Sequence, residues 1–301
     1  MCGIVGLFLK NKSLEPQLGQ MLAGMLGTMC ERGPDSAGFA VYGSGDSGHV
    51  KLTLRGASAK TNFAALAGMV EDAIGAPVLV ETHATHAVFT VPAELETAAR
   101  EAIAAEDKTV KVVSAGNRME IYKEVGRPDK VAQRFDLAHM KGSHGIGHTR
   151  MATESAVTVD GAHPFSTGRD QCLVHNGSLS NHNALRRKLV RKGMSFETEN
   201  DTEVAAHYLT WRMEEGETLG QALESSIEDL DGFYTFVVGT ESGFGVLRDP
   251  IACKHAVLAE TDDWVAMATE YRAIAQLPGA ETARIWEPAP QTIYTWEGHA
   301  A

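Results

Sequence analysis

The sequence lacks several features that would place it in other classes of protein. No apolar run approaches the roughly 20 residues needed to cross a bilayer, and the first ten residues lack the basic segment and cleavage site of a secretory signal. Basic residues are few, with 27 Lys and Arg against 39 Asp and Glu, and they form no cluster that could hold a polyanion. We therefore expect a cytoplasmic protein that binds neither membranes nor nucleic acid.

Metal-ligand and disulfide patterns are also missing. The four cysteines show no C-x-x-C spacing, which argues against a zinc knuckle or a disulfide framework. The histidines between positions 144 and 182 match no ligand signature either, so we expect no catalytic metal. Because free cysteine is among the most buried residue types, Cys30, Cys172 and Cys253 are expected in apolar surroundings.

The chain is long enough to bury a full core as one domain that spans residues 1–301, since 44% of its 301 residues are hydrophobic. Helical spacing of apolar residues predicts a helix over residues 14–29. From about 49 to 124 the pattern changes to strand, helix, two strands, helix and strand. This order predicts an inserted α/β module of the βαββαβ type, similar to ferredoxin-like folds.

The N-terminal sequence MCGIVG places a thiol beside a potential free amine. A small second residue permits removal of Met1, after which Cys2 carries both the thiol and the α-amino group. An α-amine has an ordinary pKa of about 7.7 to 8.0 and a thiol about 8.5, so the amine can accept the thiol proton without a separate histidine. Alone, however, a Met-Cys start more often opens a buried strand.

Further motifs follow in a fixed order along the chain. They are ERGPDSAG, GHTRMAT, HPF, LVHNGSLSN and NDTE, followed by FYTFVVGT and MATEYRAI. In this order they resemble the class II glutamine amidotransferases, and the resemblance covers nearly everything outside the inserted module. It implies an α+β fold, the four-layered αββα sandwich of N-terminal nucleophile hydrolases, with the module added to it.

The resemblance assigns catalytic roles to three residues. Cys2 is the nucleophile, and the Asn176 side-chain amide and the Gly177 backbone N–H hold the oxygen of the scissile carboxamide. Losing one such donor typically costs about 2.7 to 4 kcal/mol of barrier lowering. Without the resemblance, Asn176-Gly177 reads as a two-residue hairpin turn, because both residue types accept positive φ.

The resemblance also implies a pocket for an amino acid. Arg150 binds the α-carboxylate through its planar guanidinium, Thr153 lines the same pocket, and Asp201 binds the α-ammonium group. Arg32 holds its loop near the nucleophile. The family continues after this threonine with His or a small polar residue, whereas Glu154 follows here.

Each of these residues also has a simpler interpretation. Arg150 can form a surface ion pair, and Pro34 and Asp35, beside Arg32, can form a tight turn. Asp201 can belong to a helix start in which Asn200 is the N-cap and Glu203 completes a capping box.

The implied activity is that of a glutaminase, hydrolysing L-glutamine to glutamate and ammonia. The chain shows no acceptor domain and no GxxxxGK[ST] loop, so a separate synthase subunit is expected to receive the ammonia in a hetero-oligomer. The module and the segments GAHPFSTG and RDPIACK resemble the stand-alone amidotransferase subunit of N-methylglutamate synthase and of archaeal-type glutamate synthase. That likeness implies FMN in the partner and no cofactor in this chain.

Two other functions remain open at this point. The chain could be a non-catalytic glutamine-binding or assembly subunit, which retention of Met1 would favour. It could also be an N-terminal nucleophile hydrolase that acts on another amide, although a carboxylate-binding Arg150 paired with Asp201 argues for an amino-acid substrate.

Overall fold

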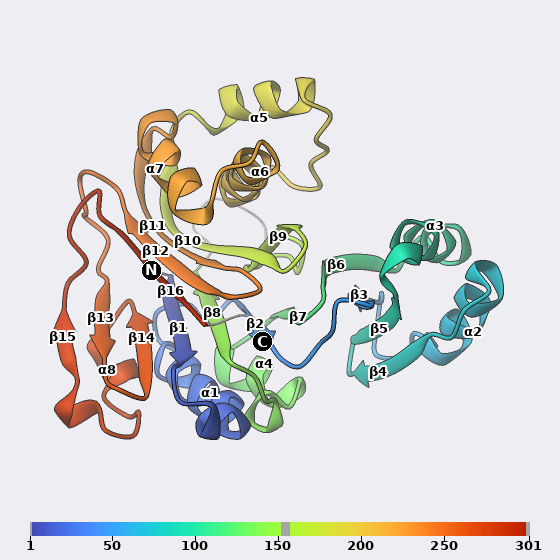
Figure 1. The fold of residues 1–301 in the computed structure, drawn as a ribbon, viewed down its shortest axis with the longest axis horizontal. Coiled ribbons are helices and arrows are strands. Elements are labelled where there is room, and N and C mark those ends of the chain that lie inside the picture. The colour runs from blue at the N-terminus through green and yellow to red at the C-terminus, as the bar shows by residue number, and fades with distance from the viewer. Residues whose placement is uncertain (1, 152–156, 299–301) are drawn as a thin grey trace.

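Two antiparallel sheets form the centre of the protein. The computed structural model describes residues 2–151 and 157–298 (Figure 1). The strand order of the seven-stranded sheet is β15 (Arg284–Trp286), β13 (Val257–Glu260), β14 (Trp264–Ala268), β1 (Gly3–Leu9), β8 (His144–Arg150), β2 (Ser36–Tyr42) and β7 (Met119–Val125). The order of the five-stranded sheet is β16 (Ile293–Glu297), β12 (Gly243–Arg248), β11 (Gly232–Gly239), β10 (Gln171–Leu179) and β9 (Phe165–Gly168).

Helices cover the outer face of each sheet. The seven-stranded sheet is covered by α1 (Leu18–Thr28), α4 (Pro128–Arg134) and α8 (Tyr271–Ile274). The five-stranded sheet is covered by α5 (His182–Arg191), α6 (Asp201–Glu214) and α7 (Leu219–Asp229). A third apolar core, which includes Ile4, Ile146 and Val237, lies between the sheets. The layers therefore run helix, sheet, sheet, helix, and the predicted αββα sandwich is confirmed.

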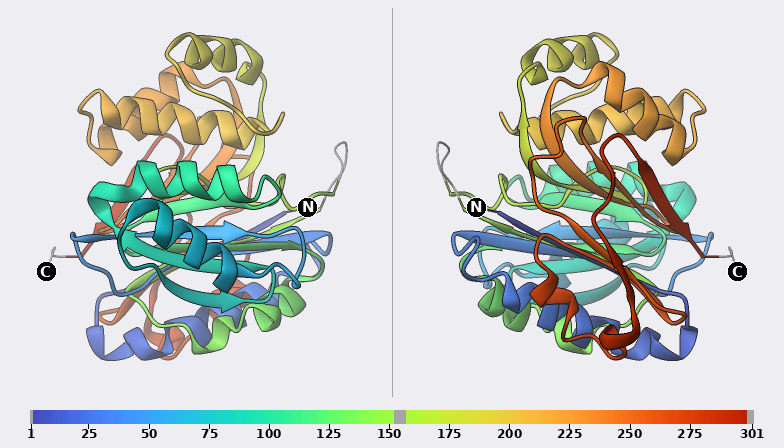
Figure 2. Two further views of the ribbon diagram at one scale, coloured as in Figure 1. Left: turned by 90° about the vertical axis from the view of Figure 1, so that its right-hand side faces the viewer. Right: turned by 90° about the vertical axis from the view of Figure 1, so that its left-hand side faces the viewer.

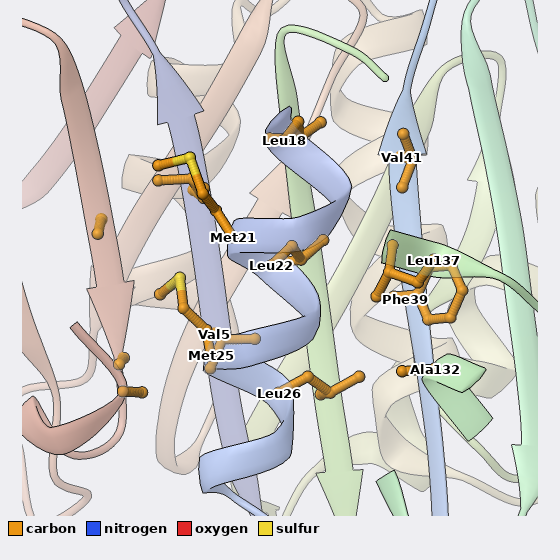
Figure 3. Close-up of a cluster of buried hydrophobic side chains, with 14 of the residues drawn as sticks. Val5, Leu18, Met21, Leu22, Met25, Leu26, Phe39, Val41, Ala132 and Leu137 are labelled. Carbon is orange, nitrogen blue, oxygen red and sulfur yellow. The ribbon is translucent and has the colours of Figure 1, made fainter. Parts of the chain in front are cut away.

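Helix α1 packs on β1, the strand that follows Cys2, and on its neighbour β8. In Figure 3, Met21 and Met25 lie over β1, while Leu22 and Leu26 point toward β8. Glycine makes this approach possible, because a Cβ atom added at Gly145 of β8 would lie 2.7 Å from Leu22 Cδ2. The helix layer is thus packed closely against β1 and β8.

The start of α1 differs from the prediction. The helix predicted from residue 14 begins at Leu18, and residues Lys12–Gln17 form the 3-10 helix η1 instead. Pro16 lies inside η1 and has no amide hydrogen to donate to an α-helical turn. Three further 3-10 helices are η2 (Ala93–Leu95), η3 (Leu137–His139) and η4 (Ala280–Thr282).

The inserted segment forms a separate four-stranded sheet. Its order is β4 (Leu79–His83), β5 (His86–Pro92), β3 (His49–Arg55) and β6 (Lys111–Gly116), with α2 (Phe63–Ile74) and α3 (Glu96–Glu106) on one face. These helices face away from the body (Figure 2). The last predicted strand of the module, β7, instead pairs with β2 in the seven-stranded sheet. The module sheet therefore ends at Gly116, before the predicted limit at 124.

The face of the module sheet without helices packs on the body. Lys51 Nζ donates to Glu120 Oε1 over 2.7 Å, and the buried His86 ring lies 4.8 Å from the Phe135 ring and 5.8 Å from the Tyr122 ring. Burial lowers the pKa of His86 to about 3, so its ring is neutral at this junction. The contacts of the module with β7 and the segment after α4 thus include an ion pair and a group of rings.

One cysteine differs from expectation. Cys30 and Cys172 are buried as predicted, whereas the prediction for Cys253 is wrong because its side chain is exposed. The turn after β12 wraps around Arg248, whose guanidinium donates to the carbonyls of Ala252 and Lys254. Carbonyls on both sides of Cys253 therefore point inward, and its side chain points out.

None of the helices in the described part of the chain combines the length and apolar character that a bilayer crossing requires.

Candidate active site

Cys2 lies directly before β1, in the middle of the seven-stranded sheet. Gly3 pairs with Thr149 of β8, and Ile4 exchanges hydrogen bonds with Thr269 at the end of β14. The half-buried Cys2 thiol has its Sγ 3.9 Å from the Met151 carbonyl oxygen. The candidate nucleophile is therefore placed by a central strand, which is a rigid support.

Two side chains predicted from the sequence converge on Cys2. Arg32 Nε donates to the Cys2 carbonyl oxygen over 3.1 Å, and Asn176 Nδ2 donates to the same oxygen over 3.2 Å. Arg32 comes from the loop between α1 and β2, whereas Asn176 comes from β10 in the other sheet. The structure thus brings together the candidate nucleophile, the loop arginine and the candidate oxyanion donor.

His148 determines which way the Asn176 amide points. His148 Nε2 lies 3.1 Å from the His175 carbonyl oxygen, so this nitrogen carries the ring proton. The same N–H lies 3.2 Å from the Asn176 side chain, which must therefore present its oxygen to His148. The Asn176 NH₂ group is left to donate to Thr269 Oγ1 and toward Cys2. An oxyanion donor needs this orientation.

The interpretation of Asn176-Gly177 as a hairpin turn is wrong. Both residues lie inside β10 and pair with Thr235 and Tyr234 of β11. Gly177 has φ 149°, and a Cβ atom there would lie 1.9 Å from the Phe233 carbonyl oxygen. Only glycine fits this approach of two backbones, which explains the residue type without a turn.

Three neutral histidines fill the space behind Asn176. The rings of His148 and His163 lie 4.0 Å apart, and His163 Nε2 and His175 Nδ1 contact the Thr202 hydroxyl at 2.8 and 2.9 Å. Burial lowers the pKa of His148 to about 3, that of His163 well below its ordinary value, and that of His175 in the same direction. Across residues 2–151 and 157–298, no group of three or more His, Cys, Asp and Glu side chains is arranged to hold a metal.

The candidate substrate residues lie on two different elements. Arg150 ends β8, is buried, and accepts a hydrogen bond at its carbonyl from the Asp35 amide. Asp201 begins α6, where its Oδ2 accepts the Leu179 amide over 2.9 Å and its Oδ1 lies 3.7 Å from His175 Nδ1. Asp201 is thus tied to the strand that carries Asn176. Thr153, predicted for the same pocket, lies outside the described residues.

The start of α6 follows the prediction in part. The Asn200 side chain accepts the Thr202 amide over 2.8 Å, which confirms it as the N-cap. The predicted capping box is wrong, because the Glu203 carboxylate turns past the cap to the amides of Glu197 and Thr198. Glu203 therefore fixes the loop that leads into the helix rather than the cap residue.

Comparison with known proteins identifies the family. Residues 148–276 match the model of the glutamine amidotransferase domain. The chain is 60% identical over its full length, and over the full length of the relative, to the glutamine amidotransferase-like protein GlxB of Rhizobium meliloti. It is 33% identical over 99% of its length to a protein of Methanothermobacter thermautotrophicus that is named as a glutamine amidotransferase and is matched over its full length. The chain belongs to the class II glutamine amidotransferases.

The fold agrees with this assignment. The B. subtilis glutamine phosphoribosylpyrophosphate amidotransferase superposes with a TM-score of 0.61 over 98% of this amidotransferase, at 19% sequence identity. The present chain covers 49% of that protein, so the likeness concerns the amidotransferase fold alone.

Sequence reasoning missed three residues of this amidotransferase site. His148 was assigned a structural role and proves to orient Asn176, while Thr269 joins Asn176 to β1. Glu270 forms ion pairs with both Arg32 and Arg272, so it holds the arginine that contacts Cys2. Thr269 and Glu270 lie in the MATEYRAI motif, which marked the segment but not the contacts.

Proposed function

We propose that this amidotransferase hydrolyses L-glutamine through a thioester on Cys2 once Met1 has been removed. The Cys2 α-amine takes the thiol proton, and the sulfur attacks the side-chain carbonyl carbon of glutamine. The C–N bond then breaks, and the amine passes the proton to the departing ammonia. Water, deprotonated by the same amine, hydrolyses the γ-glutamyl thioester to glutamate and restores the thiol.

The main support for this mechanism is the placement of Asn176 beside Cys2. Its Nδ2 lies 3.2 Å from the Cys2 carbonyl oxygen, and His148 holds the amide in the orientation in which it donates. In the proposed reaction, Asn176 Nδ2 and the Gly177 N–H stabilise the oxyanion of the tetrahedral intermediate. Donors that are fixed before the reaction need no reorganisation during it, which is why they lower the barrier.

Recognition of glutamine is proposed to depend on charges at both sides of its α-carbon. Arg150 binds the α-carboxylate with Thr153 beside it, and Asp201 binds the α-ammonium group. Asp201 is exposed over 22% of its side chain, so it can reach a ligand while remaining tied to β10. A pair of opposite charges selects a zwitterionic amino acid over a plain amide.

We further propose that the ammonia passes to a separate synthase subunit. Free ammonia is protonated in water near neutral pH and is then no longer a nucleophile, so an acceptor site must lie close by. The partner is proposed to be of the N-methylglutamate synthase or glutamate synthase type, with FMN bound there and not in this chain. A cytoplasmic hetero-oligomer follows from this arrangement. The competing proposal keeps glutamine binding but makes the chain a non-catalytic assembly subunit.

Covalent labelling separates these two proposals. The purified chain, alone and with candidate partner subunits, is treated with 6-diazo-5-oxo-norleucine, and its intact mass and peptide map are recorded. We expect loss of Met1 and one adduct at Cys2, absent in Cys2→Ala. The exposed thiol of Cys253 supplies the control, since Cys253→Ala should be labelled like the wild type. A chain that keeps Met1 and takes no label at Cys2 even with partners would favour the assembly role.

Substrate class is tested by rate comparison. Glutamine, asparagine and a simple amide are supplied in parallel, and ammonia release is measured. We expect turnover of glutamine only, and loss of that preference in Arg150→Met. Equal rates with the simple amide would contradict amino-acid recognition.

A further inference from the structure

A cleft lies where the inserted module meets the body. It has a volume of about 440 Å³ and is bounded by β6 and α3 of the module and by β9, α6 and residues 195–198 of the body. β6 and β9 lie side by side there (Figure 1). None of the described residues assigned to glutamine chemistry lines it. A cleft of this size suits a small metabolite.

The inner wall of the cleft contains a buried lysine. Lys123 is 7% exposed, and its ammonium donates to the carbonyls of Ala162 at 3.1 Å and Asp160 at 3.4 Å, 4.9 Å from the centre of the Phe165 ring. Among the described residues no carboxylate oxygen lies within 4 Å of this ammonium. Burial lowers the pKa of Lys123 to about 8, and the charge of the Asp160 carboxylate, which acts in the opposite direction, offsets this only in part. A buried cation in this state favours an anionic ligand.

A hydroxyl group in the same wall also lacks a partner. Ser114 on β6 is 4% exposed and lines the cleft, and its Oγ has no hydrogen-bond partner in the described part of the chain. Buried polar atoms are nearly always paired, so Ser114 Oγ is available as a hydrogen-bond partner for a ligand at this wall. Ser114 and Lys123 thus offer a donor pair on adjoining elements of the module and the body.

Charges around the cleft favour one negative group rather than several. Arg100 and Arg169 share the single carboxylate of Glu96, and Lys111 bonds to Asp160 over 3.1 Å. Three further carboxylates line the cleft and would repel a doubly charged anion; they belong to Glu197, Glu203 and Glu214. Glu197 and Glu214 are exposed, so water weakens their charges, whereas the buried Glu203 acts on Lys123 together with Asp160 and Glu197.

We propose that this cleft binds a small monocarboxylic acid, with its carboxylate on Lys123 Nζ and Ser114 Oγ. The apolar part of such a ligand would lie against Phe165 and Val113, which line the cleft. Lys123 also holds the carbonyl of Ala162, next to His163 in the histidine group behind Asn176. The site is therefore placed to report a metabolite to the catalytic residues. That coupling rests on the proposed glutaminase activity, whereas binding itself does not.

The test measures binding in the absence of glutamine, so its result is independent of the proposed catalysis. L-Lactate, which has no α-ammonium group for Asp201, is titrated calorimetrically into the full-length protein. We expect one site, weakened about tenfold or more in Lys123→Met because a charge-assisted bond is lost, and several-fold in Ser114→Ala. The exposed Lys108, outside the cleft, provides the control Lys108→Met, which should bind as the wild type does.

Three results would overturn the proposal of a monocarboxylate site. They are no heat of binding at tens of millimolar lactate, equal binding by Lys123→Met with its fold shown intact by circular dichroism, and tighter binding of inorganic phosphate than of lactate. Ser114→Ala removes a single buried oxygen and keeps the fold, so it serves as the second test if Lys123→Met is unstable.

Discussion

In the proposed mechanism, the orientation of the Asn176 amide group connects His148 to catalysis. Replacing His148 by Phe keeps the ring volume but removes the N–H that holds the Asn176 oxygen. The amide can then rotate, and the oxyanion loses its fixed donor in part of the molecules. We expect kcat for glutamine to fall by about 10-fold to 100-fold, less than the 10²–10³ typical of deleting a donor, with little change in KM.

The matched control for this prediction lies on the same strand. His144 is also a buried histidine of β8, but it bonds to the Thr240 carbonyl and stacks on Tyr42, away from Cys2. His144→Phe should reduce stability and leave kcat near the wild-type value. If both variants lose kcat equally, the effect comes from general loosening of β8. In Asn176→Ala, adding His148→Phe should change kcat little, because the two residues act as a unit.

Gly177 is the residue at which backbone geometry allows no side chain. Gly177→Ala would place a Cβ atom 1.9 Å from the Phe233 carbonyl oxygen at a φ of 149°, so β10 and β11 must separate. We expect a loss of more than about 2 kcal/mol in the free energy of unfolding, measured with urea, together with loss of glutaminase activity. Gly27→Ala in α1 meets no atom within 4 Å and should be neutral or stabilising by up to about 1 kcal/mol.

At the scale of elements, Glu203 links helix α6 to the loop before it. Its carboxylate accepts the amides of Glu197 and Thr198 at 2.7 and 2.8 Å and the Thr198 hydroxyl at 2.6 Å. Glu203→Gln replaces one acceptor oxygen by a donor and removes the charge. We expect the free energy of unfolding to fall by about 1–3 kcal/mol. The neighbouring Glu199 is exposed, and Glu199→Gln should change the urea midpoint little. An equal loss of stability in both variants would show that Glu203 does not fix the loop.

The same elements show what sequence patterns can and cannot specify. Apolar spacing located α1, and Asn200 was correctly read as the cap of α6. The sequence pattern of β7 predicted a strand but not its partner strand. Alternation of apolar and polar residues indicates which face of a strand is buried, but not which neighbouring strand pairs with its edge. Without the resemblance, Asn176-Gly177 reads as a turn for a related reason. A glycine needed for close approach of two strands looks the same in sequence as one needed for a turn.

For the molecule as a whole, the resemblance of ordered motifs predicted the αββα sandwich, and two independent sheets with a shared core confirm it. The same motifs predicted that Cys2, Arg32 and Asn176 would meet. The contacts that orient them were not predictable, since His148 and Thr269 reach Asn176 from the other sheet. The cleft beside Lys123 was equally hidden, because it exists only where the module and body are packed together.

The buried histidines make a prediction about the stability of the entire fold. Burial lowers the pKa of His86, His144 and His148 to about 3, against an ordinary value of about 6.5. Between these values the unfolded chain binds protons that the folded chain does not, so the free energy of unfolding must fall as the pH drops below about 6.5. Each histidine contributes a slope of about 1.4 kcal/mol per pH unit once its unfolded form is protonated. Urea unfolding at several pH values from 7.5 down to 5 should therefore show steep acid destabilisation. His144→Phe should flatten that slope by about one proton, and an unchanged slope in this variant would show that the ring is protonated within the fold.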